Sequence, residues 1–395
     1  APHLLGGSMS VQDLRLVLLL PHGGSLSAWG RNGSLQREMA ACRRLAEMGG
    51  NIAVISYGGA EDLKYQSQLP GIHIAVNRFK LPDKIYARAI PWLHRKCLAR
   101  ATVIKSRQIS GSRVALRIAK RFKIPFIARC GYLLSEFESH ENPQGFDEAL
   151  ALEGLVFNDS DINVVTSKAM KTYVMEKHKV REPKIRIIPN YVLEDFFLVK
   201  RHPIRTPPRI CTVGHLEAQK NLFALIEACA GLDVELEIIG EGSQKDALLA
   251  HAQTQGVNLH LTSRIEHRLL PGHLARAAVF ALVSHYEGHP KELIEAMSAA
   301  TPVLGANRAG IADVITDNRT GLLCGTSARE IREGLQKLLS APDFAENLGG
   351  NARIFAHEHY HIDAVVALEL ELYDDLMAGR RTMEAANMLG TPDIG

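Results

Sequence analysis

SHYEGHPKELIEAMSAATPVL, residues 284–304, combines a tight turn, a helix and the return to a strand. The apolar run at residues 279–283 precedes it and is typical of a buried strand in a parallel sheet. The turn at residues 287–290 then leads into an amphipathic segment that ends before Pro302. A strand, a loop, a helix and a second strand in this order predict an α/β fold, in which ligands bind at the carboxyl ends of the strands.

The start of this helix is a candidate phosphate site, because its unpaired N–H groups and the positive end of its dipole favour an anion. Glu287 lies in the turn before the helix, and Glu295 lies about one turn inside it. Two carboxylates in these places can accept hydrogen bonds from sugar hydroxyls on both sides of a diphosphate. The alternative is that Glu292 and Glu295 only stabilise the positive end of an ordinary helix. The spacing alone leaves both interpretations open.

The pattern E-G-x-P-x-x-L-x-E-A-M-x-x-x-x-P-V at residues 287–303 resembles the EX7E signature of the retaining GT-B glycosyltransferases of family 4. The resemblance implies that Glu287 faces the donor sugar near the reacting carbon and that Glu295 binds the ribose hydroxyls. It also implies that backbone N–H groups of residues 291–293 hold the diphosphate. The other donor-site residues implied by this stretch are Gly288, Pro290, Lys291, Glu292 and Leu293. Ala300 stands where the family commonly has glycine.

A second motif, VGHLEAQKNL at residues 213–222, is similar to the V-G-R-L-x-x-x-K-G donor loop of the same family. Lys220 matches the family lysine that neutralises the donor diphosphate, and together with Glu287 it forms the implied catalytic pair. His215 replaces the family arginine, which would offer a permanently charged fork, whereas histidine is often neutral at pH 7. Either Lys220 carries most of the phosphate contact, or a base such as Arg264 compensates. Arg264 and Ile265 belong to a stretch resembling the one that frames the nucleobase.

The length of 395 residues suffices for two domains, and a hydrophobic content of 46% with 23% charged residues is that of an ordinary soluble protein. The resemblance implies a GT-B fold, with two doubly wound Rossmann-like α/β domains facing a central cleft. We expect the acceptor-side domain at residues 9–197, the nucleotide-sugar domain at 205–360, and a terminal helix at 361–380 that crosses back to the first domain. Residues 382–395 are expected to form a tail without a core.

The first half of the chain alternates strands and helices, as a doubly wound sheet requires. Residues 21–33 read as a loop rich in glycine and serine, and Gly33 at its end can bring backbone N–H groups close to an anion. A plain connection is the alternative, while the resemblance implies contact with the donor phosphates and the acceptor. In the family a histidine often follows the strand predicted at 124–129. Here Arg129 and Tyr132 are the acceptor-side candidates instead.

Residues 84–135 contain thirteen Lys and Arg residues and no acid. The positive electrostatic potential of such a stretch attracts an anionic lipid surface or a phosphorylated acceptor. Tyr86, Trp92 and Leu93 alternate with the charges, as in a segment that lies at a membrane interface. A solvated helix face is the competing interpretation. Nucleic acid is a weaker alternative, since no nucleic-acid-binding motif is recognised, and we expect no nucleic-acid partner.

No metal or cofactor is expected beyond the donor itself. The triplet Asp159-Ser160-Asp161 imitates a metal-binding D-x-D motif, but it precedes a predicted strand and reads as a polar turn. The six cysteines are scattered without a paired spacing, which favours a reducing cytoplasm. No apolar run approaches the ~20 residues that span a bilayer, and residues 1–12 do not read as a signal peptide. We therefore expect a cytoplasmic protein, with peripheral attachment to the inner face of the membrane as an option.

These expectations combine into one function. The resemblance implies retaining, metal-independent transfer of a hexosyl group from a nucleotide diphosphate sugar to an acceptor hydroxyl, in glycoconjugate or polysaccharide biosynthesis. UDP is favoured because a ribose-binding glutamate suits it, although GDP would satisfy the same contacts. The acceptor could be a saccharide, a lipid-linked sugar or a small molecule. Two alternatives remain: a nucleotide-sugar 2-epimerase of GT-B fold and a non-catalytic GT-B binding subunit.

Overall fold

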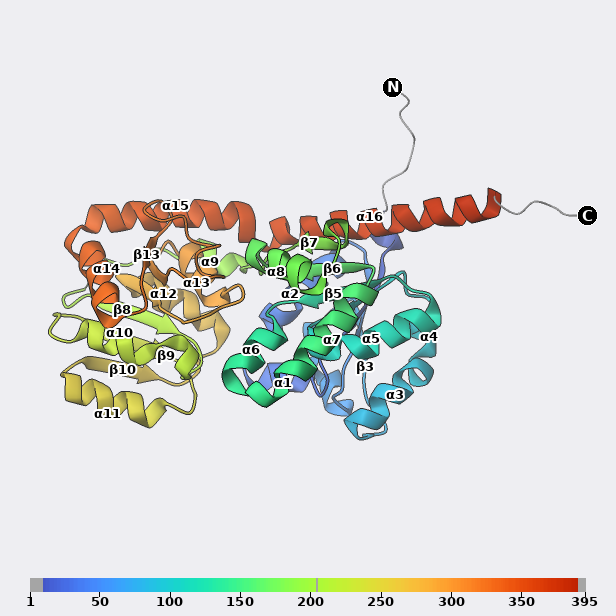
Figure 1. Cartoon of the computed structure of the whole chain (residues 1–395), viewed down its shortest axis with the longest axis horizontal. Helices are drawn as coiled ribbons and strands as arrows, with labels where there is room; N and C mark the ends of the chain where they lie inside the picture. The colour runs from blue at the N-terminus through green and yellow to red at the C-terminus, as the bar shows by residue number, and fades with distance from the viewer. Residues whose placement is uncertain (1–9, 204, 390–395) are drawn as a thin grey trace, which may run out of the picture.

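The structure, a computed structural model, describes residues 10–203 and 205–389. Two parallel β-sheets with flanking helices form two domains, which lie beside each other along the long axis of the molecule (Figure 1). The first domain occupies the right of that view and the second domain the left. This arrangement confirms the expected α/β architecture with two Rossmann-like domains.

The first sheet has seven parallel strands in the order β3-β2-β1-β4-β5-β6-β7. Its strands are β1 (Arg15–Leu19), β2 (Asn51–Ile55), β3 (Ile72–Ala75), β4 (Val103–Ser106), β5 (Phe126–Cys130), β6 (Ile162–Val165) and β7 (Ile185–Ile187). Its helices are α1 (Leu26–Arg31), α2 (Leu35–Glu47), α3 (Asp83–Leu93), α4 (Arg95–Leu98), α5 (Ile109–Phe122), α6 (Leu134–Glu141), α7 (Phe146–Asp159) and α8 (Lys168–His178). The strand order reverses between β1 and β4, which makes the carboxyl ends of these two strands the point where a ligand is expected.

The second sheet repeats this topology with six parallel strands in the order β10-β9-β8-β11-β12-β13. Its strands are β8 (Arg209–Val213), β9 (Glu235–Ile239), β10 (Asn258–Thr262), β11 (Val279–Leu282), β12 (Val303–Ala306) and β13 (Leu322–Cys324). Its helices are α9 (Glu194–Leu198), α10 (Leu222–Cys229), α11 (Lys245–Gln255), α12 (Leu270–Arg276), α13 (Lys291–Ser298), α14 (Ala328–Ser340) and α15 (Pro342–Tyr360). The order reverses between β8 and β11, so a ligand of this domain is expected to bind at the carboxyl ends of these two strands.

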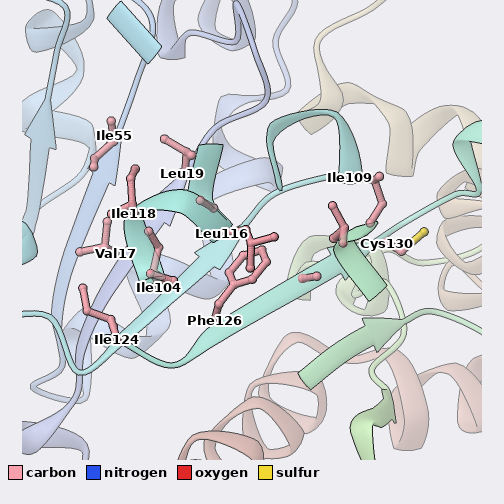
Figure 2. Close-up of a cluster of buried hydrophobic side chains, with 14 of the residues drawn as sticks. Val17, Leu19, Ile55, Ile104, Ile109, Leu116, Ile118, Ile124, Phe126 and Cys130 are labelled. Carbon is pink, nitrogen blue, oxygen red and sulfur yellow. The ribbon is translucent and has the colours of Figure 1, made fainter. Parts of the chain in front are cut away.

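The strand β1 shows why these apolar runs become buried strands. Val17 and Leu19 pack into the cluster on one face of the sheet, whereas Leu16 and Leu18 pack into the cluster on the other face. Successive side chains point to opposite faces of a strand, so only a continuous apolar run satisfies a sheet that is covered on both sides. Figure 2 shows the first cluster, in which Phe126 of β5 lies among the apolar side chains of β1, β4 and α5.

The C-terminal helix α16 (Ile362–Leu389) returns from the second domain to the first. It follows α15 and runs along the first domain (Figure 1), where Val366 and Tyr373 join the buried cluster on one face of the first sheet. The helix continues beyond the expected end at residue 380 as far as Leu389, so residues 382–389 of the expected tail are helical. Residues 390–395 lie outside the described residues.

The predicted loop at residues 21–33 contains the short helix α1. The Ser25 hydroxyl accepts a hydrogen bond from the Ala28 N–H at 3.1 Å and caps the helix. The buried Asp62 carboxylate accepts two more, from the N–H groups of Leu26 at 2.9 Å and Ser27 at 2.7 Å. Asp62 satisfies donors that a helix start otherwise leaves unpaired, and it is too distant in sequence for a local pattern to reveal this.

The basic stretch at residues 84–135 divides into an inner and an outer part. Lys105 and Arg129 are buried, while Arg107 faces the space between the domains. The expectation that Tyr86 lies at an interface is wrong, because its side chain is fully buried and its hydroxyl lies 2.7 Å from His94 Nε2. Trp92 does face outward, with 71% of its surface exposed. Within residues 10–203 and 205–389, no helix combines the length and apolarity needed to span a bilayer.

Candidate active site

A cavity of about 420 Å³ lies between the two domains. Pro21 and Arg107, which follow β1 and β4, line it from the first domain. Gly214, which follows β8, and the first residues of α13, which comes after β11, line it from the second domain. The reversal points of both sheets therefore open into one space, whose size is that of an ordinary small-molecule site.

The turn before α13 brings the two domains into close contact. A Cβ atom on Gly288 would lie 2.8 Å from the carbonyl oxygen of Gly131 in the first domain, so this position requires glycine. Pro290 is the N-cap of α13. A proline side chain carries no hydrogen-bonding group, and the N–H groups of the first helical turn are left for another acceptor. Lys291 and Glu292 of this turn line the cavity.

Lys220 lies at the end of a 3₁₀ turn (Ala218–Lys220) and is almost completely buried. Its Nζ atom is 2.7 Å from Glu287 Oε1 and 3.7 Å from Glu292 Oε1. Burial alone would lower the pKa of Lys220, but the Glu292 and Glu287 carboxylates outweigh burial and raise it above its usual value. Lys220 therefore remains a cation beside the start of α13.

Glu295 is also nearly inaccessible, with 1% of its surface exposed. Its Oε1 atom lies 2.7 Å from His267 Nε2 and 3.4 Å from Arg37 of the first domain. Its Oε2 atom has no hydrogen-bond partner among the described residues, although Glu295 lines the cavity. A buried carboxylate oxygen without a donor is a place where a ligand hydroxyl would bind.

The remaining donor-site candidates are divided between the cavity and the core. Gly33, His215, Arg264 and Ile265 line the cavity, as the family resemblance implies. Leu293 is fully buried in the core of the second domain, so only its backbone N–H can serve a ligand.

The two acceptor-side candidates lie apart from the cavity. Arg129 is buried and donates a hydrogen bond to Asn190 Oδ1 at 2.7 Å, and Asn190 Nδ2 donates to the His289 carbonyl at 2.7 Å. Arg129 therefore reaches the turn before α13 through Asn190. Tyr132 lines a smaller hollow of about 290 Å³, which also includes Phe137 and Glu287. Tyr132 and Glu287 therefore line the same hollow.

Four residues of the site escaped prediction from the sequence: Arg37, Glu38, Arg107 and His267. His267 follows the predicted nucleobase segment by two residues, and Arg37 and Glu38 follow the Gly33 loop, so proximity to a known motif was the available signal. Glu38 Oε1 accepts from Lys291 Nζ at 2.8 Å, and Glu38 also pairs with Arg37 and Arg107. These contacts connect the two walls of the cavity.

The Asp159–Asp161 triplet takes the polar-turn role that its position predicts. It joins the end of α7 to β6, Asp161 accepts a hydrogen bond from the Phe126 N–H at 2.7 Å, and Asp159 pairs with Lys120. Among the described residues, no group of three or more His, Cys, Asp and Glu side chains is arranged to hold a metal ion.

Two family models match adjacent parts of this chain. Residues 39–195 match Glycosyltransferase Family 4, and residues 196–355 match Glycosyl transferases group 1. The glycogen synthase of Mycobacterium tuberculosis is 25% identical over 240 residues, which cover 58% of this chain and 58% of that protein. The match therefore spans less than two thirds of that relative.

Solved structures with this fold cover nearly the whole chain. Sucrose-phosphate synthase from Thermosynechococcus elongatus has a TM-score of 0.75 at 19% identity, covering 92% of this chain and 100% of that one. HepE from Anabaena, in complex with UDP and glucose, has a TM-score of 0.72 at 15% identity, covering 91% and 100%. At these identities the likeness establishes the shared two-domain fold.

Proposed function

This chain belongs to the family 4, or group 1, glycosyltransferases, and we propose that it transfers a hexosyl group from a nucleotide diphosphate sugar to an acceptor hydroxyl. The arrangement around the start of α13 carries this proposal. The buried cation Lys220 lies beside Glu287 and Glu292 at the start of this helix, and Glu295 within the helix keeps an unpaired Oε2. A nucleoside diphosphate presents the complementary groups, which are anionic phosphates for the cation and a ribose diol for the carboxylate.

The diphosphate would bind between Lys220 and the first turn of α13. Both carry positive charge in a site that is largely shielded from water, so they stabilise the negative charge that develops on the leaving diphosphate. They supply this charge without a metal ion, and we propose a metal-independent reaction in which the donor is the only small molecule required besides the acceptor. The charge is already in place before the donor arrives, because Glu287 and Glu292 keep Lys220 protonated.

The two glutamates of the EX7E pattern would divide the rest of the donor. Glu295 would accept hydrogen bonds from the ribose hydroxyls, for which its Oε2 atom is available. Glu287 lines the hollow around Tyr132, and we propose that the sugar meets the acceptor there. The EX7E resemblance supports retention of the anomeric configuration. UDP is the favoured nucleotide, and the complex of HepE with UDP and glucose is in line with that choice.

We also propose that α3 attaches the enzyme to an anionic membrane surface at the inner face of the membrane. Trp92 on this helix, Ile85 on the same helix and Phe79 just before it are exposed by 71%, 51% and 65%. Exposed cations lie close to these apolar residues in the sequence: Arg78, Lys80, Lys84, Arg88, Arg95 and Lys96. Apolar side chains that insert and cations that attract anionic headgroups are the two parts of an interfacial anchor.

A thermal-shift panel tests the donor assignment. UDP-glucose, UDP-N-acetylglucosamine, GDP-mannose and free UDP should raise the melting temperature if they bind the native state, with the UDP compounds giving the larger shifts. Lys220→Met should abolish these shifts, whereas Lys245→Met, which changes an exposed lysine on α11, should preserve them. The absence of any shift with wild-type protein would contradict the proposal. Incubation with UDP-N-acetylglucosamine alone would reveal a 2-epimerase through the epimer it forms.

A further inference from the structure

Three cations from both domains converge on one carboxylate in the cavity. Lys291 of the second domain donates to Glu38 Oε1 at 2.8 Å, and Arg37 Nε lies 3.3 Å from the same oxygen. Arg107 pairs with the other oxygen, Oε2. Glu38 therefore accepts contacts from three cationic side chains, which come from both domains.

Three cationic side chains contact the single Glu38 carboxylate. Of the other two glutamates that line the cavity on α13, Glu295 is shared between Arg37 and His267, and Glu292 lies 3.7 Å from Lys220. Burial and the neighbouring Arg37 and Arg107 hold the pKa of Lys291 well below its usual value. An anionic ligand group in the place of the Glu38 carboxylate would meet the same three cations.

The two arginines lie on the wall opposite the proposed diphosphate site. Arg37 is on α2 and Arg107 follows β4, so both belong to the first domain, whereas Lys220 and the start of α13 belong to the second. Arg107 also packs over the ring of Trp29, with 5.9 Å between the guanidinium carbon and the ring centroid. This support holds the guanidinium in the cavity wall, and Trp29 and Gln108 line the cavity beside it.

We propose that Arg37 and Arg107 form a second anion site, which binds an oxyanion group of the acceptor, either a phosphate or a carboxylate. The planar guanidinium fork matches both groups in bidentate geometry. Glu38 fills this site in the unliganded protein, and the acceptor's anion displaces its carboxylate. The proposal rests on the glycosyltransferase function proposed above, because it assigns the chemical class of the acceptor to the same cavity.

The test is calorimetric binding of inorganic phosphate, and separately of acetate, to the whole protein in the presence of saturating UDP. UDP fills the donor site, so any remaining anion site is measured alone, and the two probes distinguish a phosphoryl from a carboxyl preference. We expect at least one of the anions to bind. Arg107→Gln should weaken that binding at least tenfold, and Arg276→Gln, at an exposed arginine on α12, should leave it unchanged.

Glu38→Gln should change the affinity for the anion in the opposite direction. Removing the competing carboxylate should tighten anion binding several-fold, which a misfolded variant cannot produce. The inference is overturned if neither anion binds in the presence of UDP, if saturation with UDP eliminates anion binding seen without it, or if Arg107→Gln and Glu38→Gln bind as the wild type does. A failure of UDP itself to bind would instead contradict the proposed function, so the two failures are distinguishable.

Discussion

Glu287 lies in the turn before α13 and Glu295 lies within the helix, and the contacts of the two carboxylates differ. Glu287 is paired with Lys220 at 2.7 Å, whereas Glu295 keeps one oxygen without a partner among the described residues. The proposed function assigns the first to the phosphate and sugar and the second to the ribose.

Substitution of each glutamate should separate these tasks. Glu287→Gln keeps the shape of the side chain and should lower turnover by about 100-fold or more, since removing one electrostatic contact to a transition state costs about that factor. Glu295→Ala should mainly weaken UDP binding. Steady-state kinetics with the donor found in the thermal panel, together with calorimetry of UDP, measure both effects. Near-native turnover and near-native UDP affinity in both variants would show that the site is misassigned.

His289 makes stability depend on pH. Burial, reinforced by the positive charge of Arg129, lowers the pKa of His289 to about 3, so the ring is neutral in the native protein. In the unfolded chain the pKa is about 6.5, and acid therefore stabilises the unfolded state between about pH 6.5 and 3. From pH 7 to pH 5 the loss in free energy of unfolding should be about 2 kcal/mol.

His289→Phe should remove that part of the pH dependence. The ring packs edge-on against Tyr360 with centroids 5.3 Å apart, an arrangement that phenylalanine can reproduce, and His289 Nδ1 has no partner in the described part of the chain. Urea unfolding at pH 7 and pH 5 for both proteins is the measurement. If the two proteins lose the same free energy on acidification, His289 is not the group responsible.

Local sequence patterns identified the motif residues but could not identify their partners. The turn, the helix start and both glutamates were visible because they lie within one 17-residue pattern. Arg37 was not, since it reaches Glu295 across 258 positions of sequence and its contact exists only once the domains face each other. For the same reason the sequence suggested Arg129 as an acceptor-side residue but did not show that its side chain donates a hydrogen bond to Asn190.

At the scale of a single element, α13 ends in a strained conformation. Ala300, immediately after the helix, has φ of +56°, a left-handed backbone that costs a residue with a Cβ roughly 1–2 kcal/mol. Glycine avoids this cost but loses more entropy on folding, so Ala300→Gly should stabilise the protein by about 0.5–1 kcal/mol. Ala299→Gly, one residue earlier at φ of −77°, should destabilise it. Urea midpoints measure both, and a loss of stability in Ala300→Gly would refute the strain argument.

The helix α3 carries the proposed membrane contact. Vesicles of phosphatidylcholine with phosphatidylglycerol should bind the protein at low salt, and binding should weaken as salt rises, because the charges are exposed to solvent. Trp92→Ala should reduce the partition coefficient roughly tenfold, since Trp92 is the largest and most exposed of the three apolar side chains. Ile354→Ala, which changes an exposed apolar residue on α15, is the matched control. Equal sedimentation with pure phosphatidylcholine vesicles would contradict a role for anionic lipid.

At the scale of the whole molecule, the sequence predicted the two sheets because alternating strands and helices permit few topologies. Each reversal point follows from the strand order of its sheet. The location of the cavity also depends on how the two domains face each other, which the strand order does not determine. The placement of α16 along the first domain was implied by family resemblance alone. Lys105 and Glu369, which form one of its contacts, are 264 residues apart in the sequence. No local sequence pattern indicates a contact between residues so far apart.

This contact makes α16 a structural tie from the second domain to the first. Lys105 Nζ lies 2.6 Å from Glu369 Oε1, and Tyr373 donates to Glu369 Oε2 at 3.0 Å, all in the interior. Burial would raise the pKa of Glu369, but Lys105 outweighs burial and lowers it. Glu369→Ala leaves the lysine charge buried without its partner, and it should cost about 3–5 kcal/mol in free energy of unfolding.

Replacement of both partners should be much less costly than replacement of one. Lys105→Met combined with Glu369→Met removes the two buried charges together and keeps most of the volume, so the double variant should recover to within about 1–2 kcal/mol of the wild type. Calorimetric melting of the matched single variants, Lys105→Met and Glu369→Met, and of the double variant measures the coupling. In Glu369→Ala the first domain should also melt before the second, because α16 no longer holds firmly to it. Additive losses in the double variant would mean that the two side chains stabilise the tie separately, and that the ion pair itself contributes nothing to holding the domains together.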